Sequence, residues 1–404
     1  MTRATDRLKD INAQDALIMA RSALGSPRVQ HLLRGSHVVK HDGLGRFDDL
    51  QRSALSMITN STLSDSQWAQ ANLPVNEGGL GVRRVGDLAL PSFLSSAIGT
   101  TTLQDLLLSR CSRPPDPHVF SCRQSWEAIF GIAPAGINAS RQAAWLAPSI
   151  ALSKINIMSG HTTARDKAIF LAAQAPHSGA WINALPIATC GLRLDDEAIR
   201  IGVALRLGLN LCLPHECRCG AQVDVFGSHA FVCKISPGKS ARHAAVNDII
   251  ARGFGAAGVP ISREPSGLIG NSLIRPDGIS LIPWSGGKHI AWDATISTTL
   301  AESYIHTSAT RAGSAAGVAA SKKVAKYAGL GSGVSFQPVS LESLGPSCPS
   351  TADFVTTLGK RISAVSGDPA EATYLRQRLA ICLMRFNAVL LHYSFKELLR
   401  DTDE

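Results

Sequence analysis

Residues 273–298 read LIRPDGISLIPWSGGKHIAWDATIST, and this stretch decides the fold that we expect. Apolar and polar side chains alternate in 273–282 and again in 288–298, a spacing that is typical of β-strands. The Ser-Gly-Gly sequence between the two segments favours a turn. We therefore predict two neighbouring strands, with Pro276 and Trp292 on adjacent strands.

The segments around this strand pair have periodicities of their own. Helical spacing of apolar residues occurs at 243–254, 314–328, 351–365 and 370–397, and strand spacing occurs at 334–342. This order of elements predicts a mixed central sheet flanked by helices, in an α/β domain over residues 241–404.

The first half of the chain is predicted to be mostly helical. Apolar residues recur at helical spacing in 7–33, 47–58 and 89–107, and from 119 to the apolar stretch at 199–211. Turn formers at 73–81 and prolines at 109–118 interrupt the pattern, and the latter predict a linker. The protein is thus expected to be α+β overall, with four parts: helical regions at 1–110 and 119–205, a small module at 206–240, and the domain at 241–404.

Composition indicates a globular protein with a basic excess. The 404 residues are 45% hydrophobic and 18% charged, and the formal net charge is +9. Such an excess favours a polyanion such as nucleic acid as partner, although a merely basic surface would give the same count. The first residues lack the apolar core of a signal peptide, and the apolar stretches are too short to span a bilayer. We expect a soluble intracellular protein without a membrane partner.

Cysteine and histidine cluster at one place in the chain. Residues 217–233 read CRCGAQVDVFGSHAFVC and bring together Cys217, Cys219, His229 and Cys233, whereas most other cysteines are scattered. Thiolate and imidazole are the ligands that zinc prefers, so this spacing predicts a zinc site. Its role would be structural, because four protein ligands leave no position for an activated water. Cys212 and His215 are further candidate ligands, and buried cysteines beside an unrelated histidine are the alternative.

Two aspartates occupy the predicted strand pair. Asp277 lies in the first strand and Asp293 in the second, so their carboxylates would meet at one edge of the sheet, on the order of 4–6 Å apart. Such a pair would bind a hard divalent cation, and magnesium there could polarise a phosphodiester. Glu264, just upstream, is a candidate third carboxylate. A Pro-Asp pair is also common in ordinary turns.

The joint order of short motifs resembles the restriction-like endonuclease of site-specific non-LTR retrotransposons, a branch of the PD-(D/E)xK nucleases. The resemblance covers about residues 206–397 and rests on these pieces, in chain order: the Cys/Cys/His/Cys knuckle, Arg242-His243 with Asn247, Glu264-Pro265, Arg275-Pro276-Asp277, Trp292-Asp293, Lys323-Val-Ala-Lys326-Tyr327, 338–345, 358–361 and 377–379. It implies a restriction-like nuclease fold over 241–404 and a zinc knuckle at 206–240.

Upstream segments resemble the region that follows the reverse transcriptase palm in the same proteins: Asp15-Ala16-Leu17, Leu32-Leu33-Arg34, Leu73-Pro74 with 78–81, and Trp181 with 184–186. The resemblance makes 1–110 a thumb or connector region. We expect the palm itself to be absent, because the nearest carboxylate pair, Asp48-Asp49, lies in a helical segment and is interpreted as a solvated helix face. The chain would then be a truncated element or a fragment of a longer reading frame.

The sequence departs from the family at one catalytic position. The family pattern has a lysine two residues after the second acid, where this chain has Thr295. Related nucleases supply the lysine from the following helix, which favours Lys323, then Lys326, with Lys322 and Lys288 further behind. The alternative is a basic helix face that binds DNA phosphates. His243 would contact phosphate or the scissile region, or else pack or cap at the start of its helix.

The resulting hypothesis is a magnesium-dependent endonuclease, with manganese as a substitute metal. In the family such an enzyme nicks target DNA in the nucleus, and the new 3′-hydroxyl primes reverse transcription of the element's RNA. The catalytic set would be Asp277, Asp293, Lys323, Glu264, Lys326 and His243. The alternative is a catalytically inactive nucleic-acid-binding remnant that keeps its zinc. A scaffold that binds no nucleic acid fits poorly with the net charge of +9.

Overall fold

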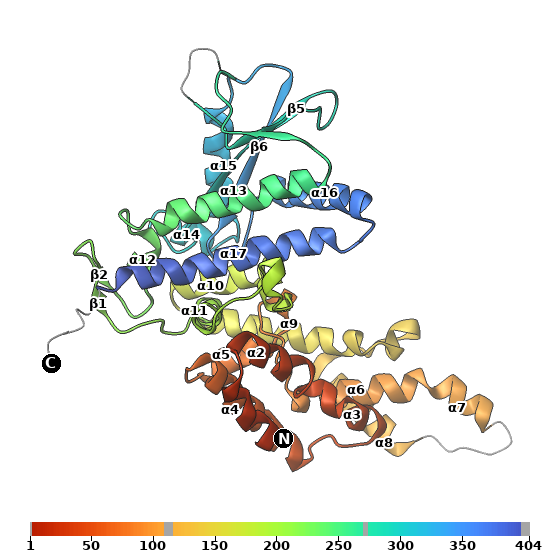
Figure 1. Cartoon of the computed structure of the whole chain (residues 1–404). Helices are drawn as coiled ribbons and strands as arrows, with labels where there is room; N and C mark the ends of the chain where they lie inside the picture. Colours follow the sequence, from red (N-terminus) through yellow and green to blue (C-terminus); the bar gives the residue numbers. More distant parts are fainter. Residues whose placement is uncertain (1, 109–115, 270–273, 397–404) are drawn as a thin grey trace. The chain divides into compact units, whose positions relative to one another are not determined.

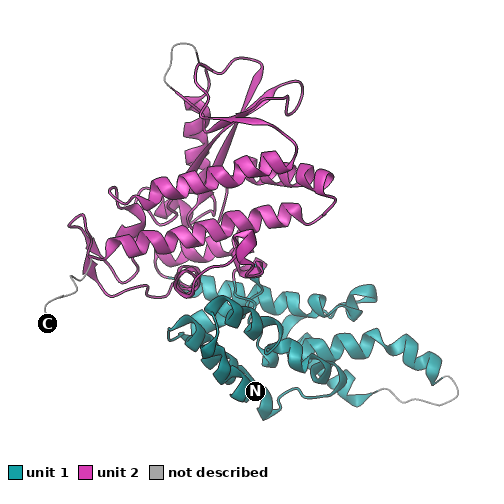
Figure 2. Ribbon diagram, viewed as in Figure 1, with its two compact units in different colours: residues 1–75, 79–161 teal, residues 76–78, 162–404 magenta. Residues whose placement is uncertain are grey.

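The computed structural model of the protein describes residues 2–108, 116–269 and 274–396 (Figure 1). Positions 109–115 of the expected linker, with Cys111, and Leu273 at the start of the first expected strand lie outside these residues. The chain forms two compact units: residues 1–75 with 79–161 are unit 1, and residues 76–78 with 162–404 are unit 2 (Figure 2).

Unit 1 is helical throughout its described residues. Its helices are α1 (Thr2–Asp6), α2 (Ala13–Ser22), α3 (Gln30–Gly35), α4 (Asp42–Thr59), α5 (Asp65–Asn72), α6 (Val85–Gly99), α7 (Thr101–Leu107), α8 (Pro117–Phe130) and α9 (Gln142–Gly160). The predicted helical pattern is confirmed here. Helix α6 is central, because its first turns pack into one apolar cluster with Leu33 and its middle packs into another with Trp126 and Trp145.

The start of α6 corrects the interpretation of the acidic pair Asp48-Asp49. Asp48 is only 5% exposed, and its carboxylate accepts hydrogen bonds from the backbone amides of Val85 at 2.7 Å and Gly86 at 3.1 Å. It therefore caps the free amides at the N-terminus of α6 from a neighbouring helix. Asp49 is exposed, so a solvated helix face describes Asp49 and is wrong for Asp48.

Unit 2 combines helices with two small sheets. Its helices are α10 (Ala164–Gln174), α11 (Asp196–Leu207), α12 (Ser228–Val232), α13 (Gly238–Ala256), α14 (Ile305–Ser308), α15 (Ser314–Lys326), α16 (Pro349–Ser366) and α17 (Glu371–Ser394). Helix α17 packs against α11, α12, α13 and α16 (Figure 1). The protein is therefore α+β overall, as predicted, although part of the region expected as a linker at 119–205 packs inside this unit.

The larger sheet has four strands in the order β3 (Ile261–Arg263), β4 (Gly278–Ser280), β5 (His289–Ser297) and β6 (Val334–Glu342). The first two pairings are antiparallel and β5 runs parallel to β6, so the mixed sheet is confirmed. A two-stranded sheet, β1 (His215–Glu216) with β2 (Gln222–Val223), lies in the cysteine-rich module.

Strand β5 is buried on both faces, and its neighbouring residues point to opposite layers of helices. Trp292 stacks on Phe254 of α13, and Phe254 contacts Phe354 of α16. The next residue, Asp293, contacts Lys323 of α15 on the other face. The aromatic part of the core thus lies on the Trp292 face, and the Asp293 side chain points to the other face, toward α15.

One detail of the predicted strand pair is wrong. Strand β4 begins at Gly278, so Pro276 precedes the strand and does not pair with Trp292; Gly278 does. A proline has no amide hydrogen for the ladder, which explains why regular pairing starts after it. Asp277 still lies beside β5, because its amide donates to the carbonyl of Trp292 at 2.9 Å. Within the described residues, no helix combines the length and apolarity that crossing a membrane requires.

Candidate functional site

Two carboxylates and a histidine converge beside the central sheet. Asp277 leads into β4, Asp293 lies in the middle of β5, and His243 lies in the second turn of α13. One ligand atom from each lies within 4.8 Å of the others. The sequence prediction that the two aspartates meet is confirmed. Two oxygens bound to one Mg²⁺ at about 2.1 Å lie at most about 4.2 Å apart, so a small movement of these side chains would let them share a cation.

Asp293 is the most deeply buried member, at 3% exposed. The ammonium of Lys323 lies 2.5 Å from its Oδ1 atom, and the hydroxyl of Tyr327 donates to Oδ2 at 2.5 Å. Burial and the bond to Asp293 raise the pKa of Tyr327, so this hydroxyl remains a donor at neutral pH. A carboxylate this buried requires such partners, and α15 supplies both.

Asp277 is held by a different set of groups. The amide of Ala294 donates to its Oδ2 atom at 2.6 Å, and Nε2 of His243 lies 3.3 Å from the same oxygen. Burial acts to raise the pKa of Asp277, but the hydrogen bonds from His243, Ala294 and Asn247 outweigh it, and the pKa is lowered. The hydrogen bond to Asp277 in turn raises the pKa of His243. His243 is thus directed at the acidic pair and is not a cap at the helix start.

The structure distinguishes among the candidate lysines. Lys323 contacts Asp293 directly, whereas the Lys326 ammonium lies 4.0 Å from Asp293 and 4.9 Å from the centre of the Tyr327 ring. The Lys326 side chain is also more exposed, at 43% against 24%. Lys322 and Lys288 are exposed and lie outside the cluster. The residue two positions after Asp293 is Thr295, which is not a cation. Lys323 of α15 instead brings an ammonium group to the Asp293 carboxylate.

Glu264 does not join the cluster. Its side chain is exposed, and its carboxylate is not among the groups that converge on His243, Asp277 and Asp293. Its backbone amide donates to the Asp277 carbonyl at 3.1 Å, and its φ of 46° is left-handed. The backbone of Glu264 therefore continues the pairing of β3 with β4, while its side chain faces solvent.

Two residues matter for the site in ways that the sequence prediction missed. A Cβ atom at Gly278 would lie 2.2 Å from the Trp292 ring, so only glycine lets the strand pass over that ring directly after Asp277. Tyr327 was recognised only as part of a motif, yet it orients Asp293. Its position four residues after Lys323 was the available signal, since both side chains then share one helix face.

The four predicted zinc ligands also converge. The Sγ atoms of Cys217 and Cys233 are 3.8 Å apart, and Cys219 Sγ lies 3.0 Å from His229 Nε2. All four ligand atoms lie within 4.8 Å of one another. A tetrahedral zinc with Zn–S bonds of about 2.3 Å separates two sulfurs by about 3.8 Å. The cluster could therefore hold a metal such as zinc.

The backbone directly after the first two cysteines forms the turn that such a site needs. Gly220 has a φ of 88°, and its amide donates to the Cys217 carbonyl at 2.8 Å. The other two candidate ligands point elsewhere: Cys212 Sγ lies against the Asp224 carbonyl, and His215 bonds Ser394. Burial raises the pKa of the Cys217 thiol, whereas the Ala221 amide lowers that of Cys219.

No protein family model matches the chain, and no curated protein is significantly similar to it. The resemblance seen in the short motifs therefore remains a prediction. The function has to be inferred from the chemistry of the two clusters.

Proposed function

We propose that the chain is a divalent-metal-dependent DNA endonuclease whose catalytic centre is the Asp277–Asp293 pair with Lys323. The observation that carries the proposal is the convergence of two carboxylates within 4.8 Å beside an ammonium group that is 30 positions away in sequence. Two acids and a lysine at the margin of a buried strand are the groups that metal-dependent cleavage of a phosphodiester requires.

The donor set fits magnesium or manganese. Carboxylate oxygens are the ligands of hard cations, and Asp277 and Asp293 would hold the ion, with His243 as a candidate third ligand or a partner of Asp277. When bound, the ion would polarise the phosphate and lower the pKa of a water molecule. Lys323 would orient that water or stabilise the charge on the phosphate, and Tyr327 would fix the Asp293 carboxylate. Lys326, more exposed, would contact the DNA backbone.

The Cys217/Cys219/His229/Cys233 cluster would hold a structural zinc ion, because four protein ligands leave no position open for substrate. The net charge of +9 suits target DNA as substrate and element RNA as a second partner. The nick would provide the 3′-hydroxyl that primes reverse transcription in a retrotransposon of the non-LTR class. Such an enzyme would act in the nucleus.

A catalytically inactive nucleic-acid-binding remnant is the second candidate. The observation that favours it is that both carboxylate oxygens of Asp293 already have partners, Lys323 on one and Tyr327 on the other. A divalent ion would have to share Asp293 with these groups or displace one of them. Both candidates predict that the chain binds DNA, and only the endonuclease predicts that it cleaves DNA.

The test is the nicking of supercoiled plasmid by the purified full chain with Mg²⁺ or Mn²⁺. We expect the wild type to nick and Asp277→Asn to lose more than about a hundredfold in rate. The matched control is Asp353→Asn, an exposed aspartate on α16, which should nick like the wild type. DNA binding should survive Asp277→Asn and fall steeply with salt. A wild type that binds DNA but never cuts it with either metal would establish the remnant.

A further inference from the structure

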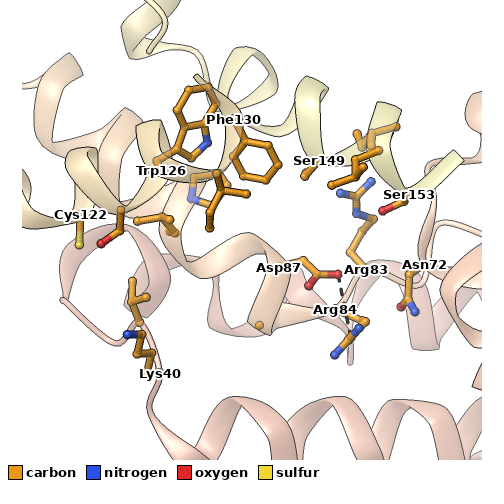
Figure 3. A pocket seen from close by; sticks show the side chains of 18 of the residues that line it. Lys40, Asn72, Arg83, Arg84, Asp87, Cys122, Trp126, Phe130, Ser149 and Ser153 are labelled. Atoms are coloured by element: carbon orange, nitrogen blue, oxygen red, sulfur yellow. Dashed lines mark ion pairs between the residues drawn. The ribbon is translucent and has the colours of Figure 1, made fainter. Parts of the chain in front are cut away.

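A cavity of about 690 Å³ lies within unit 1, and the proposed nuclease makes no use of it (Figure 3). Its walls come from the segment before α4, from α5, from the start of α6, and from α8 and α9. Pockets for small organic ligands occupy roughly 300–1,000 Å³. The cavity is therefore large enough for a single nucleotide.

The lining of the cavity carries more positive than negative charge. Its charged lining residues are Lys40, Arg83, Arg84 and Asp87, which is three positive charges against one negative. Arg84 lies 3.7 Å from Asp48 and 3.9 Å from Asp87, distances longer than a hydrogen bond. Arg84 is thus partly neutralised, and Lys40 and Arg83 are the cations with the least compensation.

Arg83 is the more informative of these two cations. In Figure 3 its guanidinium group reaches toward Ser149 and Ser153 of α9. Asp87 is its electrostatic neighbour, but within the described part of the chain Arg83 has neither a hydrogen-bond acceptor nor an ion pair within 4 Å. A half-buried guanidinium with five donors and no acceptor suits an anion with several oxygens, such as a phosphate.

Another part of the cavity wall is aromatic and apolar. Trp126 and Phe130 of α8 line it, with ring centroids 5.2 Å apart, and Leu90 and Ile150 extend the wall. Trp126 is 1% exposed and packs behind this wall against Trp145, so the half-buried Phe130 presents the ring that a ligand can contact. Such a wall suits a flat apolar ring.

We infer that this cavity binds a nucleotide, with its phosphate on Arg83, its base along the wall that Phe130 exposes, and Lys40 adding positive charge to the cavity. The nucleotide is either free or an unpaired residue of a DNA or RNA strand, since the two share this chemistry. The cavity contains no residue of the Asp277–Asp293 cluster, so the inference holds or fails independently of the nuclease.

The test is fluorescence polarisation of the full chain with an etheno derivative of adenosine monophosphate. Arg83→Gln should weaken its binding by about tenfold or more, the value of one charge-assisted hydrogen bond. Lys40→Gly should also weaken it, and the fold should tolerate this change, because Lys40 has a left-handed φ of 70° that glycine adopts without strain. The matched control is Arg46→Gln, an exposed arginine on α4 outside the cavity, which should bind like the wild type.

Competition identifies the source of the nucleotide. Displacement of the probe by unlabelled adenosine monophosphate supports a free nucleotide, and displacement only by short single-stranded DNA or RNA supports an unpaired residue in a strand. Either result supports the inference, provided that Arg83→Gln and Lys40→Gly both weaken binding of the probe. If ribose 5-phosphate, which has no base, displaced the probe as well as adenosine monophosphate does, the role of the base would be overturned. No binding, or the same weakening in Arg46→Gln, would overturn the site.

Discussion

The two metal-capable clusters of unit 2 are built in opposite ways. The Cys/His cluster takes all its ligands from 17 consecutive positions, 217–233, on a two-stranded sheet and a five-residue helix. The carboxylate cluster takes its groups from α13, from the residue before β4, from β5, and from α15 and the residue that follows it, over positions 243–327. One cluster is local in sequence, and the other exists only because the sheet forms.

Their surroundings differ as well. The buried core of the Cys/His module consists of Cys217, Cys233 and Val223, with Cys212 packed against them, so two of its ligands are also its core. Asp277 and Asp293 instead have hydrogen-bond donors from the protein and lie beside a strand buried on both faces. We therefore predict that the first cluster needs a metal in order to fold, whereas the groups of the second are already held by the protein before any metal binds.

The largest expected effect is on the Cys/His module. Cys217→Ser, or removal of zinc by a chelator, should unfold residues 212–233 locally, because structural zinc contributes about 10–16 kcal/mol of apparent binding free energy. Hydrogen exchange should show lost protection there, with the amides of β5 still protected. Ser228→Ala, a change in the same module that removes no ligand, is the control. Equal loss of protection in β5 would contradict the contrast between the clusters.

The next effect is on the stability of the carboxylate cluster. Asp293→Ala leaves the Lys323 ammonium without its partner, whereas the Tyr327 hydroxyl keeps the Arg275 carbonyl as acceptor, and we expect a loss of about 3 kcal/mol in the free energy of unfolding. Asp277→Ala should cost less, because its partner His243 has a more exposed side chain, at 39% against 24% for Lys323. Urea unfolding measures both losses. Asp353→Ala is the control, and its free energy of unfolding should hardly differ from that of the wild type. Equal losses for the two aspartates would show that α15 does not stabilise Asp293 as described.

A third prediction separates metal binding from chemistry. Lys323→Ala removes a cation 2.5 Å from Asp293, so Mn²⁺ should bind several-fold more tightly while nicking slows. Lys326→Ala should mainly weaken DNA binding and lower its salt dependence. Titration with Mn²⁺ and a nicking assay on both variants show which lysine acts in catalysis and which binds DNA. If Lys326→Ala abolishes nicking and Lys323→Ala does not, the nuclease stands and the lysine assignment is wrong.

The smallest effect concerns a third buried carboxylate, Glu342 at the end of β6. It is 0% exposed, and among the described residues no cation forms an ion pair with it; burial raises its pKa, and the Ala316 amide partly offsets this. A raised pKa in the folded state means that its contribution to stability is full at low pH and is lost as the pH rises through that pKa. As the pH rises from about 5 to about 8, the free energy of unfolding of Glu342→Gln should therefore increase relative to that of the wild type, by on the order of 1 kcal/mol. Parallel unfolding curves at both pH values would contradict this.

Much of unit 2 was predictable, because its elements carry strong local periodicity and both clusters use distinctive residue types. The Cys/His cluster was found because its ligands are neighbours in sequence. Asp277 and Asp293 were found because they lie on adjacent segments joined by a recognisable turn. Lys323 could be proposed only as one of several lysines, since the packing of α15 against β5 is a tertiary fact.

The predictions that were wrong, or that were not made, concern features that depend on tertiary packing. Glu264 is close to Asp277 in backbone pairing, but sequence spacing does not show that its side chain faces solvent. Asp48 was interpreted as solvated because its helix is amphipathic, and the helix end that it caps begins 37 positions later. The cavity beside Arg83 has walls from five separate segments, so no motif could indicate it.

The most direct test of the central claim is Mn²⁺ binding to the zinc-loaded full chain, measured by electron paramagnetic resonance. With the Cys/His cluster already filled, added Mn²⁺ should occupy the carboxylate cluster. We predict a single saturable site in the wild type and in Asp353→Asn, and its loss in Asp277→Asn. Unchanged Mn²⁺ binding in Asp277→Asn, or the absence of a site in the wild type, would contradict the claim that Asp277 and Asp293 form a metal centre.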